Sequence, residues 1–119
     1  MPGIAPQKLP RVTELILRGC RLTVLLDSVE QATAVAEASR NHGVAIGAMI
    51  EIDCDGHRGG ILPDDPPLID IAQTLYQSQA QLRGVMTHAG ESYTVVGQEA
   101  HAVFTERARK AATDGFMTL

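Results

Sequence analysis

Apolar and polar positions follow two different rhythms along this chain. Two short runs, Leu22–Leu26 and Val44–Ile52, are mostly apolar, and Leu82–Thr87 is a third segment that we interpret as a strand. A strand that is apolar on both faces is typical of a parallel sheet whose two faces are covered. The pattern therefore predicts three strands, each buried on both faces.

Two amphipathic segments flank the first predicted strand. Pro10–Arg18 places its apolar residues on one helical face, and Gly19 is well placed to end this helix in a left-handed cap. A second helix is predicted to begin at Ser28, because Ser28 and Gln31 have capping-box spacing, in which each side chain satisfies the other's backbone N–H. Gly43 is predicted to end this second helix.

Two more helices are predicted in the second half of the chain. Asp65 can cap a helix whose first turn begins at Pro66 and whose apolar residues recur at helical spacing. The last helix is predicted over Gln98–Asp114, with an apolar stripe that includes Val103 and with Gly115 after it.

The order of these elements alternates helices with strands. Such alternation predicts right-handed crossovers and a parallel sheet, which is an α/β fold. Three strands leave two apolar edges, and exposed apolar edges are avoided in stable proteins unless something covers them. Residues 1–119 are therefore expected to form a single domain that is part of a larger α/β structure, or that self-associates to complete one.

Composition narrows the classes of function. The 119 residues carry a net charge of −4, without the clustered basic excess that binds nucleic acid. Cys20 and Cys54 cannot build the disulfide framework of a small secreted domain. The opening MPGIAPQKLP lacks the apolar core of a signal peptide, and no apolar run reaches the ~18 residues of a membrane span. A soluble cytoplasmic protein with no nucleic-acid or membrane partner is expected.

Polar side chains gather directly after the second and third predicted strands. Residues 53–60 follow one strand and residues 87–93 follow the next. The carboxyl ends of parallel strands share one rim, where α/β proteins bind their ligands. We therefore expect the two segments to be neighbours and to form the site.

A calcium or phosphate site explains residues 53–60 poorly. Counted from Asp53, the central glycine position of an EF-hand holds Arg58, and the closing glutamate position holds Asp64. The three glycines of this segment match neither a Walker pattern nor G-x-G-x-x-G. They are explained equally well by a sharp turn of the backbone.

A metal centre on two adjacent loops is a second alternative. Cys54, His57 and His88 could bind zinc, although no closed tetrahedral ligand spacing is present, and Cys54 is better explained as a small buried apolar residue. A metal-dependent hydrolase that uses Asp53, Asp55, His57 and His88 stays open as a hypothesis.

Simpler structural roles also account for individual polar residues. Arg58 could be a solvated charge or a salt-bridge partner of Asp53 or Asp55, and His88 a hydrogen-bonded histidine at the rim. Tyr93 could cover the core with its hydroxyl group in water. Each of these residues, taken alone, is explained by such a role.

Taken together, the two strand-end segments resemble a known family. EIDCDGHRGGI and LRGVMTHAGESY, preceded by IAPQKLPRVTELI and LTVLLDSVEQA, resemble the D-serine dehydratase and D-threonine aldolase family of pyridoxal-phosphate enzymes. Their larger domain is similar to the alanine racemase N-terminal barrel, and the resemblance covers roughly Ile4 to Phe116. It implies that residues 1–119 are a central fragment of a TIM-type (β/α)₈ barrel, about three of its eight βα units.

The resemblance also implies a site and a reaction. Arg58 and His88 would face the ring of pyridoxal phosphate, and Tyr93 would lie near the reacting end, where it could donate a proton. Asp55 stands where many relatives have glycine. The intact parent enzyme would act on a small D-amino acid by deamination or retro-aldol cleavage.

The same resemblance implies what this chain lacks. The family's Schiff-base lysine lies on the first barrel strand, and neither Lys8 nor Lys110 matches that position. The family's divalent-metal ligands and later phosphate-binding loops belong to carboxyl-terminal parts that are absent here. This chain alone is therefore expected to be inactive and to self-associate through its open barrel edges. A non-catalytic, self-associating α/β module is the alternative.

Overall fold

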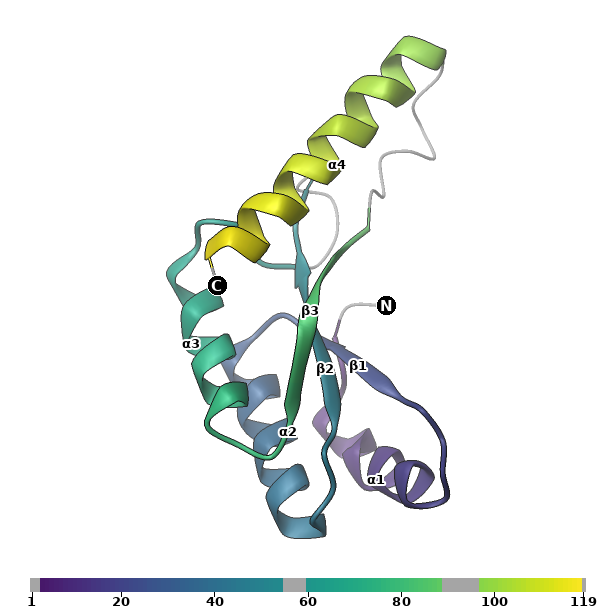
Figure 1. Cartoon of the computed structure of the whole chain (residues 1–119), viewed down its shortest axis with the longest axis vertical. Coiled ribbons are helices and arrows are strands. Elements are labelled where there is room, and N and C mark those ends of the chain that lie inside the picture. Colours follow the sequence, from purple (N-terminus) through teal and green to yellow (C-terminus); the bar gives the residue numbers. More distant parts are fainter. Residues whose placement is uncertain (1–2, 55–59, 89–96, 119) are drawn as a thin grey trace.

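A computed structural model of the chain describes residues 3–54, 60–88 and 97–118 (Figure 1). Helices and strands alternate, as the pattern predicts. The elements are η1 (Pro6–Lys8), α1 (Leu9–Leu17), β1 (Thr23–Leu26), α2 (Val29–His42), β2 (Gly47–Ile52), α3 (Pro66–Tyr76), β3 (Gln81–Thr87) and α4 (Gln98–Thr118).

The three strands form one parallel sheet in the order β1-β2-β3. β2 is central, with Val24 beside Ala48 on one side and Ile50 beside Val85 on the other. This topology confirms the predicted parallel α/β fold. All three strands therefore end at the same rim of the sheet.

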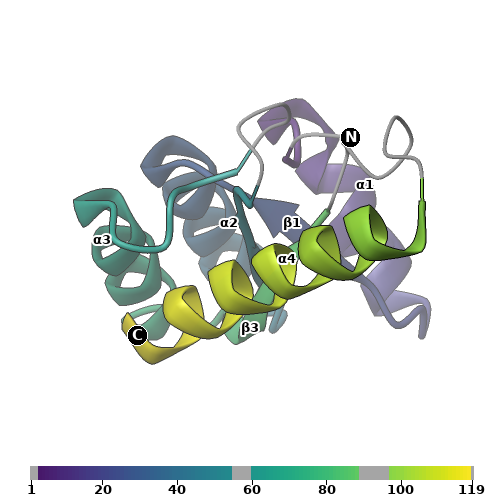
Figure 2. The ribbon, with the colours of Figure 1, turned by 90° about the horizontal axis from the view of Figure 1, so that it is seen from above.

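One face of the sheet carries the core. The strands and the helices α2 and α3 contribute to a single cluster of buried apolar residues, and α2 packs against α3 (Figures 1 and 2). The residues of β1 and β2 on this face are at most 7% exposed; they are Val24, Leu26, Ala48, Ile50 and Ile52. Residues from α2 and α3 fill the other side; they include Ala32, Val35, Leu68, Ile71 and Leu75.

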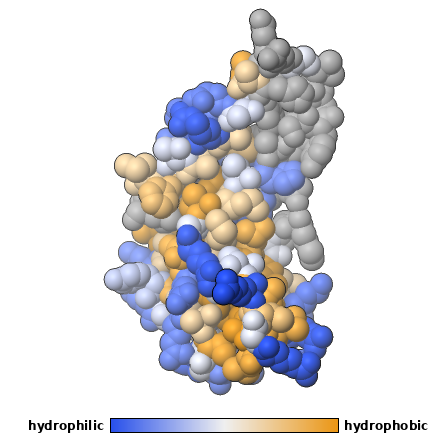
Figure 3. All heavy atoms as spheres, turned by 45° about the vertical axis from the view of Figure 1, so that its right-hand side comes forward, coloured by the Kyte–Doolittle hydropathy of each residue, from blue (hydrophilic) through white to orange (hydrophobic). Residues whose placement is uncertain are grey.

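The opposite face, which we call the open face, is less covered. Side chains alternate along a strand, so Leu25, Met49 and Met86 lie on this face, and each is only half-buried. Figure 3 brings forward the side away from α2 and α3 and shows an apolar area across the middle of the molecule. The prediction that every strand is buried on both faces is thus wrong for β1 and β3, because no described element covers their second face.

Local signals in the sequence set most helix ends. Ser28 Oγ accepts a hydrogen bond from the Gln31 N–H at 3.2 Å, and Gly43 ends α2 with φ +64°. Gly19 has φ +95° and lets the Cys20 N–H donate to the Leu15 carbonyl at 3.0 Å, the pattern of a Schellman cap. The predicted Ser28 cap and both glycine ends are confirmed, whereas the reciprocal half of the capping box is wrong, because Gln31 Oε1 accepts from the Asp27 N–H and not from the Ser28 N–H.

The start of α3 differs in its mechanism from the prediction. Asp65 occupies the N-cap position before Pro66, but its side chain makes no capping hydrogen bond. Pro66 explains this start well enough, because proline has no N–H to satisfy and its φ suits the first helical turn.

The end of α4 was predicted wrongly, because Gly115 does not stop the helix. α4 continues to Thr118, and Gly115 is buried where the helix packs against β2. A Cβ atom at Gly115 would lie 2.8 Å from Ile52 Cδ1, so only glycine permits this close approach without a shift. The amino-terminal half of α4 projects past the sheet (Figures 1 and 2), which leaves Val103 62% exposed instead of in an apolar contact stripe.

Candidate functional site

The candidate site lies at the rim where the three strands end. Glu51 of β2 and Met86 of β3 are register partners on the open face. Asp53 and His88 each follow two residues later, so the described beginnings of the two polar segments lie next to each other, whereas residues 55–59 and 89–93 lie outside the described residues. Asp27 follows the last residue of β1 at the same rim.

Two cross-strand contacts hold the ends of β2 and β3 together. Thr87 Oγ1 donates a hydrogen bond to the Ile52 carbonyl at 2.9 Å. Cys54 Sγ donates to the His88 carbonyl at 3.7 Å, a long contact typical of a thiol donor. Cys54 is half-buried with a polar contact, so it is not simply a buried apolar residue. These contacts fix the backbone on which His88 stands.

The backbone after β2 returns to the sheet at Ile61. The Asp53 N–H donates to the Ile61 carbonyl at 2.8 Å, and the Ile61 N–H donates to the Glu51 carbonyl at 2.9 Å. Ile61 thereby forms a parallel bridge with Ile52. Gly60 just before it has φ +125°, so the turn explanation of this glycine is confirmed.

Glu51 is the site residue that sequence reasoning missed. Glu51 is 2% exposed, although glutamate is seldom buried in proteins. The sequence did contain a signal, because Glu51 is an acid between two isoleucines in an otherwise apolar strand. A buried carboxylate at the rim can accept hydrogen bonds or bind a cation.

His88 is the one predicted cofactor-facing residue that the described structure places at the rim. It is half-buried, and its Nδ1 atom is shielded from solvent. Arg58 and Tyr93 lie outside the described residues, and so do Asp55 and His57 of the proposed hydrolase. Within the described residues, no group of three His, Cys, Asp or Glu side chains could hold a metal ion.

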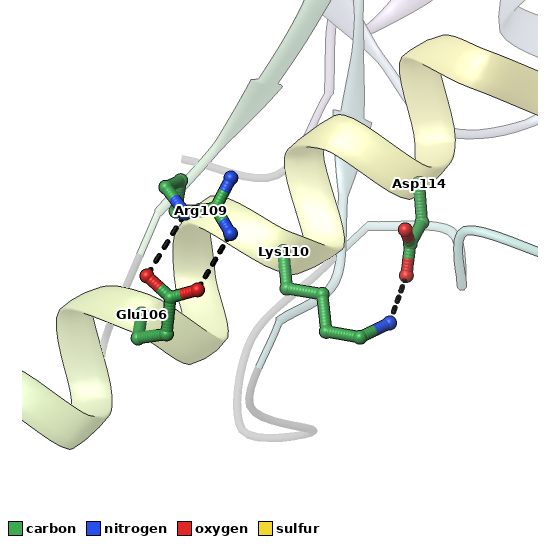
Figure 4. A network of polar contacts seen from close by, with 4 residues as sticks. All are labelled: Glu106, Arg109, Lys110 and Asp114. Atoms are coloured by element: carbon green, nitrogen blue, oxygen red, sulfur yellow. Dashed lines mark hydrogen bonds and ion pairs between the residues drawn. The ribbon is translucent and has the colours of Figure 1, made fainter.

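Both lysines are exposed on helical segments. Lys8 is exposed on η1, before the first strand. Lys110 is exposed on α4, where its Nζ forms an ion pair with Asp114 Oδ2 at 2.6 Å (Figure 4).

An ion pair on α4 shifts the pKa values of both of its members. The pKa of Glu106 lies below its ordinary value because the Arg109 guanidinium donates hydrogen bonds to its carboxylate (Figure 4), and the same contact raises the pKa of Arg109. This pair stabilises the helix above the ordinary pKa of glutamate and loses that effect as the pH falls through the lowered value. Both groups are fully exposed, so the effect on stability is small.

A groove of about 470 Å³ lies elsewhere, on the outer side of the helices. It is lined by residues of α2, α3 and the turn after α3, among them Arg40 and Gln77. None of its lining residues comes from a strand end. The chemistry of the rim and this groove are therefore separate.

Comparison with known proteins identifies the family. Residues 5–117 match the family described as alanine racemase, N-terminal domain. The chain belongs to this family. Its three parallel βα units agree with part of a TIM-type barrel. None of the helices in the described residues combines the length and apolarity that crossing a membrane requires.

Two curated relatives act on hydroxylated D-amino acids according to their names. The chain is 45% identical over 108 residues to D-threo-3-hydroxyaspartate dehydratase from Delftia sp. (strain HT23). This match covers 90% of this chain and 28% of the dehydratase. It is 27% identical over 86 residues to 3-hydroxy-D-aspartate aldolase from Paracoccus denitrificans (strain Pd 1222), covering 71% of this chain and 22% of the aldolase. The chain thus spans less than a third of the relatives it matches.

Solved structures agree with this assignment. The Delftia dehydratase superposes with a TM-score of 0.91 at 42% identity over 94% of this chain and 30% of that one. D-threonine aldolase from Filomicrobium marinum superposes with a TM-score of 0.78 over 97% of this chain and 31% of that one, and at 23% identity it supports the fold alone.

Proposed function

We propose that this chain forms part of the cofactor-binding rim in a pyridoxal-phosphate enzyme that acts on a 3-hydroxy-D-amino acid. The observation that carries the proposal is the 45% identity with D-threo-3-hydroxyaspartate dehydratase. A match of 108 residues in a chain of 119 necessarily includes both polar segments at the strand ends. The aldolase relative, also named for a 3-hydroxy-D-aspartate, supports the same substrate class.

The described residues fit one part of such a site. The imidazole of His88 at the end of β3 can pack on or hydrogen-bond an aromatic ring, and Arg58 and Tyr93 are proposed to complete this side of the site. Bound pyridoxal phosphate supplies the electron sink for reactions at the α-carbon. The open face ends at this rim. Its apolar side chains would therefore keep water away from the side of the cofactor that faces the sheet.

The described residues do not fit the covalent anchor of the cofactor. Covalent binding of pyridoxal phosphate requires a lysine amine beside the cofactor. Both lysines of this chain are instead exposed, one on η1 and the other on α4. The proposal therefore places the anchoring lysine outside these 119 residues. A divalent metal is proposed to be bound outside them as well; a solved structure of a variant of the Delftia dehydratase is of its metal-free form.

A segment exchange tests the proposed function directly. The matching segment of the Delftia dehydratase would be replaced by this chain, and turnover of D-threo-3-hydroxyaspartate would be followed by release of ammonia. We expect the hybrid protein to bind pyridoxal phosphate and to turn over its substrate, because the backbone superposes closely and the rim residues belong to the same family.

Two outcomes of the exchange are informative. The same hybrid carrying His88→Ala is expected to lose about a hundredfold in kcat/KM, which is the lower end of the range for removal of one well-placed catalytic hydrogen-bond donor. A folded hybrid that binds the cofactor but acts on no 3-hydroxy-D-amino acid would contradict the proposal.

A self-associating module is the second candidate, favoured by the half-buried apolar residues of the open face. Leu25, Met49 and Met86 lie on that face, and β1 and β3 are its edges among the described strands. We propose that two copies of the chain bury these faces and edges against each other. Light scattering at micromolar concentration is then expected to give at least twice the 12.7 kDa of one chain.

A substitution on the open face provides the control for this association. Met86→Glu introduces a charge on the edge strand β3 of that face and is expected to return the mass to a single chain. A monomeric mass for the unsubstituted chain at normal stability would exclude the self-associating module.

A further inference from the structure

A long-range hydrogen bond ties the end of β1 to the backbone that follows β2. Asp27 Oδ2 accepts from the Gly60 N–H at 2.9 Å, although the two residues are 33 positions apart. A Cβ atom at Gly60 would lie 2.8 Å from the Asp53 nitrogen, so the Gly60 backbone also lies directly against the end of β2. Gly60 is therefore held between the ends of two strands.

Asp27 is in turn held by Gln31 of α2. The Gln31 carboxamide uses both of its polar atoms, since Oε1 accepts from the Asp27 N–H at 2.7 Å and Nε2 donates to the Ile4 carbonyl at 3.2 Å. The Gln31 backbone N–H is bound by Ser28 Oγ. The carboxamide also occupies the space that a Cβ at Gly3 would take. Gln31 thus joins the amino-terminal segment, the end of β1 and the start of α2.

We propose that Asp27 and Gln31 are positioning residues that fix the rim end of β2. They act on Gly60 and Ile61, and Ile61 is bound on both sides to backbone groups of Glu51 and Asp53. Disturbing Asp27 would therefore loosen the backbone beside the buried Glu51. The catalytic consequence rests on the proposed function, whereas the effect on the backbone does not.

Amide hydrogen exchange on the 119-residue chain tests the effect on the backbone. Asp27→Ala removes the acceptor, and the protection of the Gly60 amide is expected to fall by about tenfold to a hundredfold, the range for loss of a hydrogen bond to a charged group. The amide of Ile50, in the middle of β2, is expected to change by less than about threefold, since local opening there does not depend on Asp27.

Two variants separate positioning from a general loss of stability. Asp27→Asn keeps a side-chain oxygen and is expected to restore most of the protection at Gly60. Glu30→Ala removes an exposed carboxylate from the first turn of the same helix and is expected to leave Gly60 unchanged. Unchanged protection of Gly60 in Asp27→Ala, or an equal fall at Gly60 and Ile50, would overturn the proposal. If Asp27→Ala does not fold, Gln31→Met replaces it, because this variant removes the side-chain acceptor that holds Asp27. The protection of Gly60 in Gln31→Met is then compared with that in Asp27→Asn.

The segment exchange described above provides the catalytic readout. In the hybrid, Asp27→Ala is expected to lower kcat/KM by about tenfold, with recovery in Asp27→Asn, while Glu30→Ala stays at the unsubstituted rate. Equal rates for Asp27→Ala and the unsubstituted hybrid would overturn the catalytic consequence. An inactive unsubstituted hybrid would instead count against the proposed function, and the exchange result at Gly60 would still decide the structural proposal.

Discussion

Pyridoxal phosphate and borohydride are expected to leave the isolated 119-residue chain without a stoichiometric lysine adduct that depends on the fold. Both lysines are exposed on helical segments, Lys8 on η1 and Lys110 on α4. Lys110 is also engaged in an ion pair with Asp114 at 2.6 Å. An enzyme of this chemistry holds its lysine next to the cofactor site. Pyridoxal phosphate is therefore expected to react with an exposed surface lysine without selectivity for the folded chain.

Intact mass after reduction at equimolar cofactor measures this expectation. Labelling is expected to be low and equal in the folded chain and in the chain unfolded in urea. The segment-exchange hybrid serves as the positive control, because it should gain one adduct per protein. A single adduct that forms in the folded 119-residue chain and disappears in urea would show that Lys8 or Lys110 does serve as the anchor.

Features set by neighbouring residues were predictable from the sequence. The Ser28 cap and the glycine ends at Gly19 and Gly43 are encoded within one helical turn, and each is present in the structure. The parallel order of the strands followed from the alternation of apolar runs with helices. The same rule brought the ends of β2 and β3 together at one rim.

Features set by distant residues were not predictable in this way. The capping-box spacing correctly placed the Ser28 contact, but the Gln31 side chain reaches Asp27 and Ile4 instead of the Ser28 N–H. Gly115 looked like a helix end because its contact with Ile52 lies 63 positions away in the sequence. Chain-local patterns carry no information about such contacts.

The burial of the strands shows the same limit on a larger scale. Apolar residues on both faces of β1 and β3 predicted two covered faces, yet only one face is covered by the described helices. The sequence pattern is that of a strand within a complete barrel, and this chain spans 28% of the dehydratase it resembles. The apolar open face fits the proposal that this chain forms part of a larger barrel.

Two adjacent leucines are expected to differ strongly in their contribution to stability. Leu26 is fully buried on the helix-covered face of β1, whereas Leu25 is half-buried on the open face. Leu26→Ala is expected to lower the free energy of unfolding of the isolated chain by about 2–5 kcal/mol, the range for a truncated core leucine. Leu25→Ala is expected to cost about 1 kcal/mol or less, because part of its surface is already in water. Urea unfolding followed by circular dichroism measures both values.

The difference in cost between Leu25→Ala and Leu26→Ala is expected to shrink in the complete barrel. This change tests the role of the open face more sharply than the values in the isolated chain. In the segment-exchange hybrid the open face faces the barrel interior, so Leu25→Ala is expected to become nearly as costly as Leu26→Ala. If Leu26→Ala does not fold as an isolated chain, Leu26→Val and Leu25→Val provide the same contrast at lower cost. Equal costs for the two alanine variants in the isolated chain would mean that its open face is already buried. A dependence of unfolding on chain concentration would then assign that burial to a second copy.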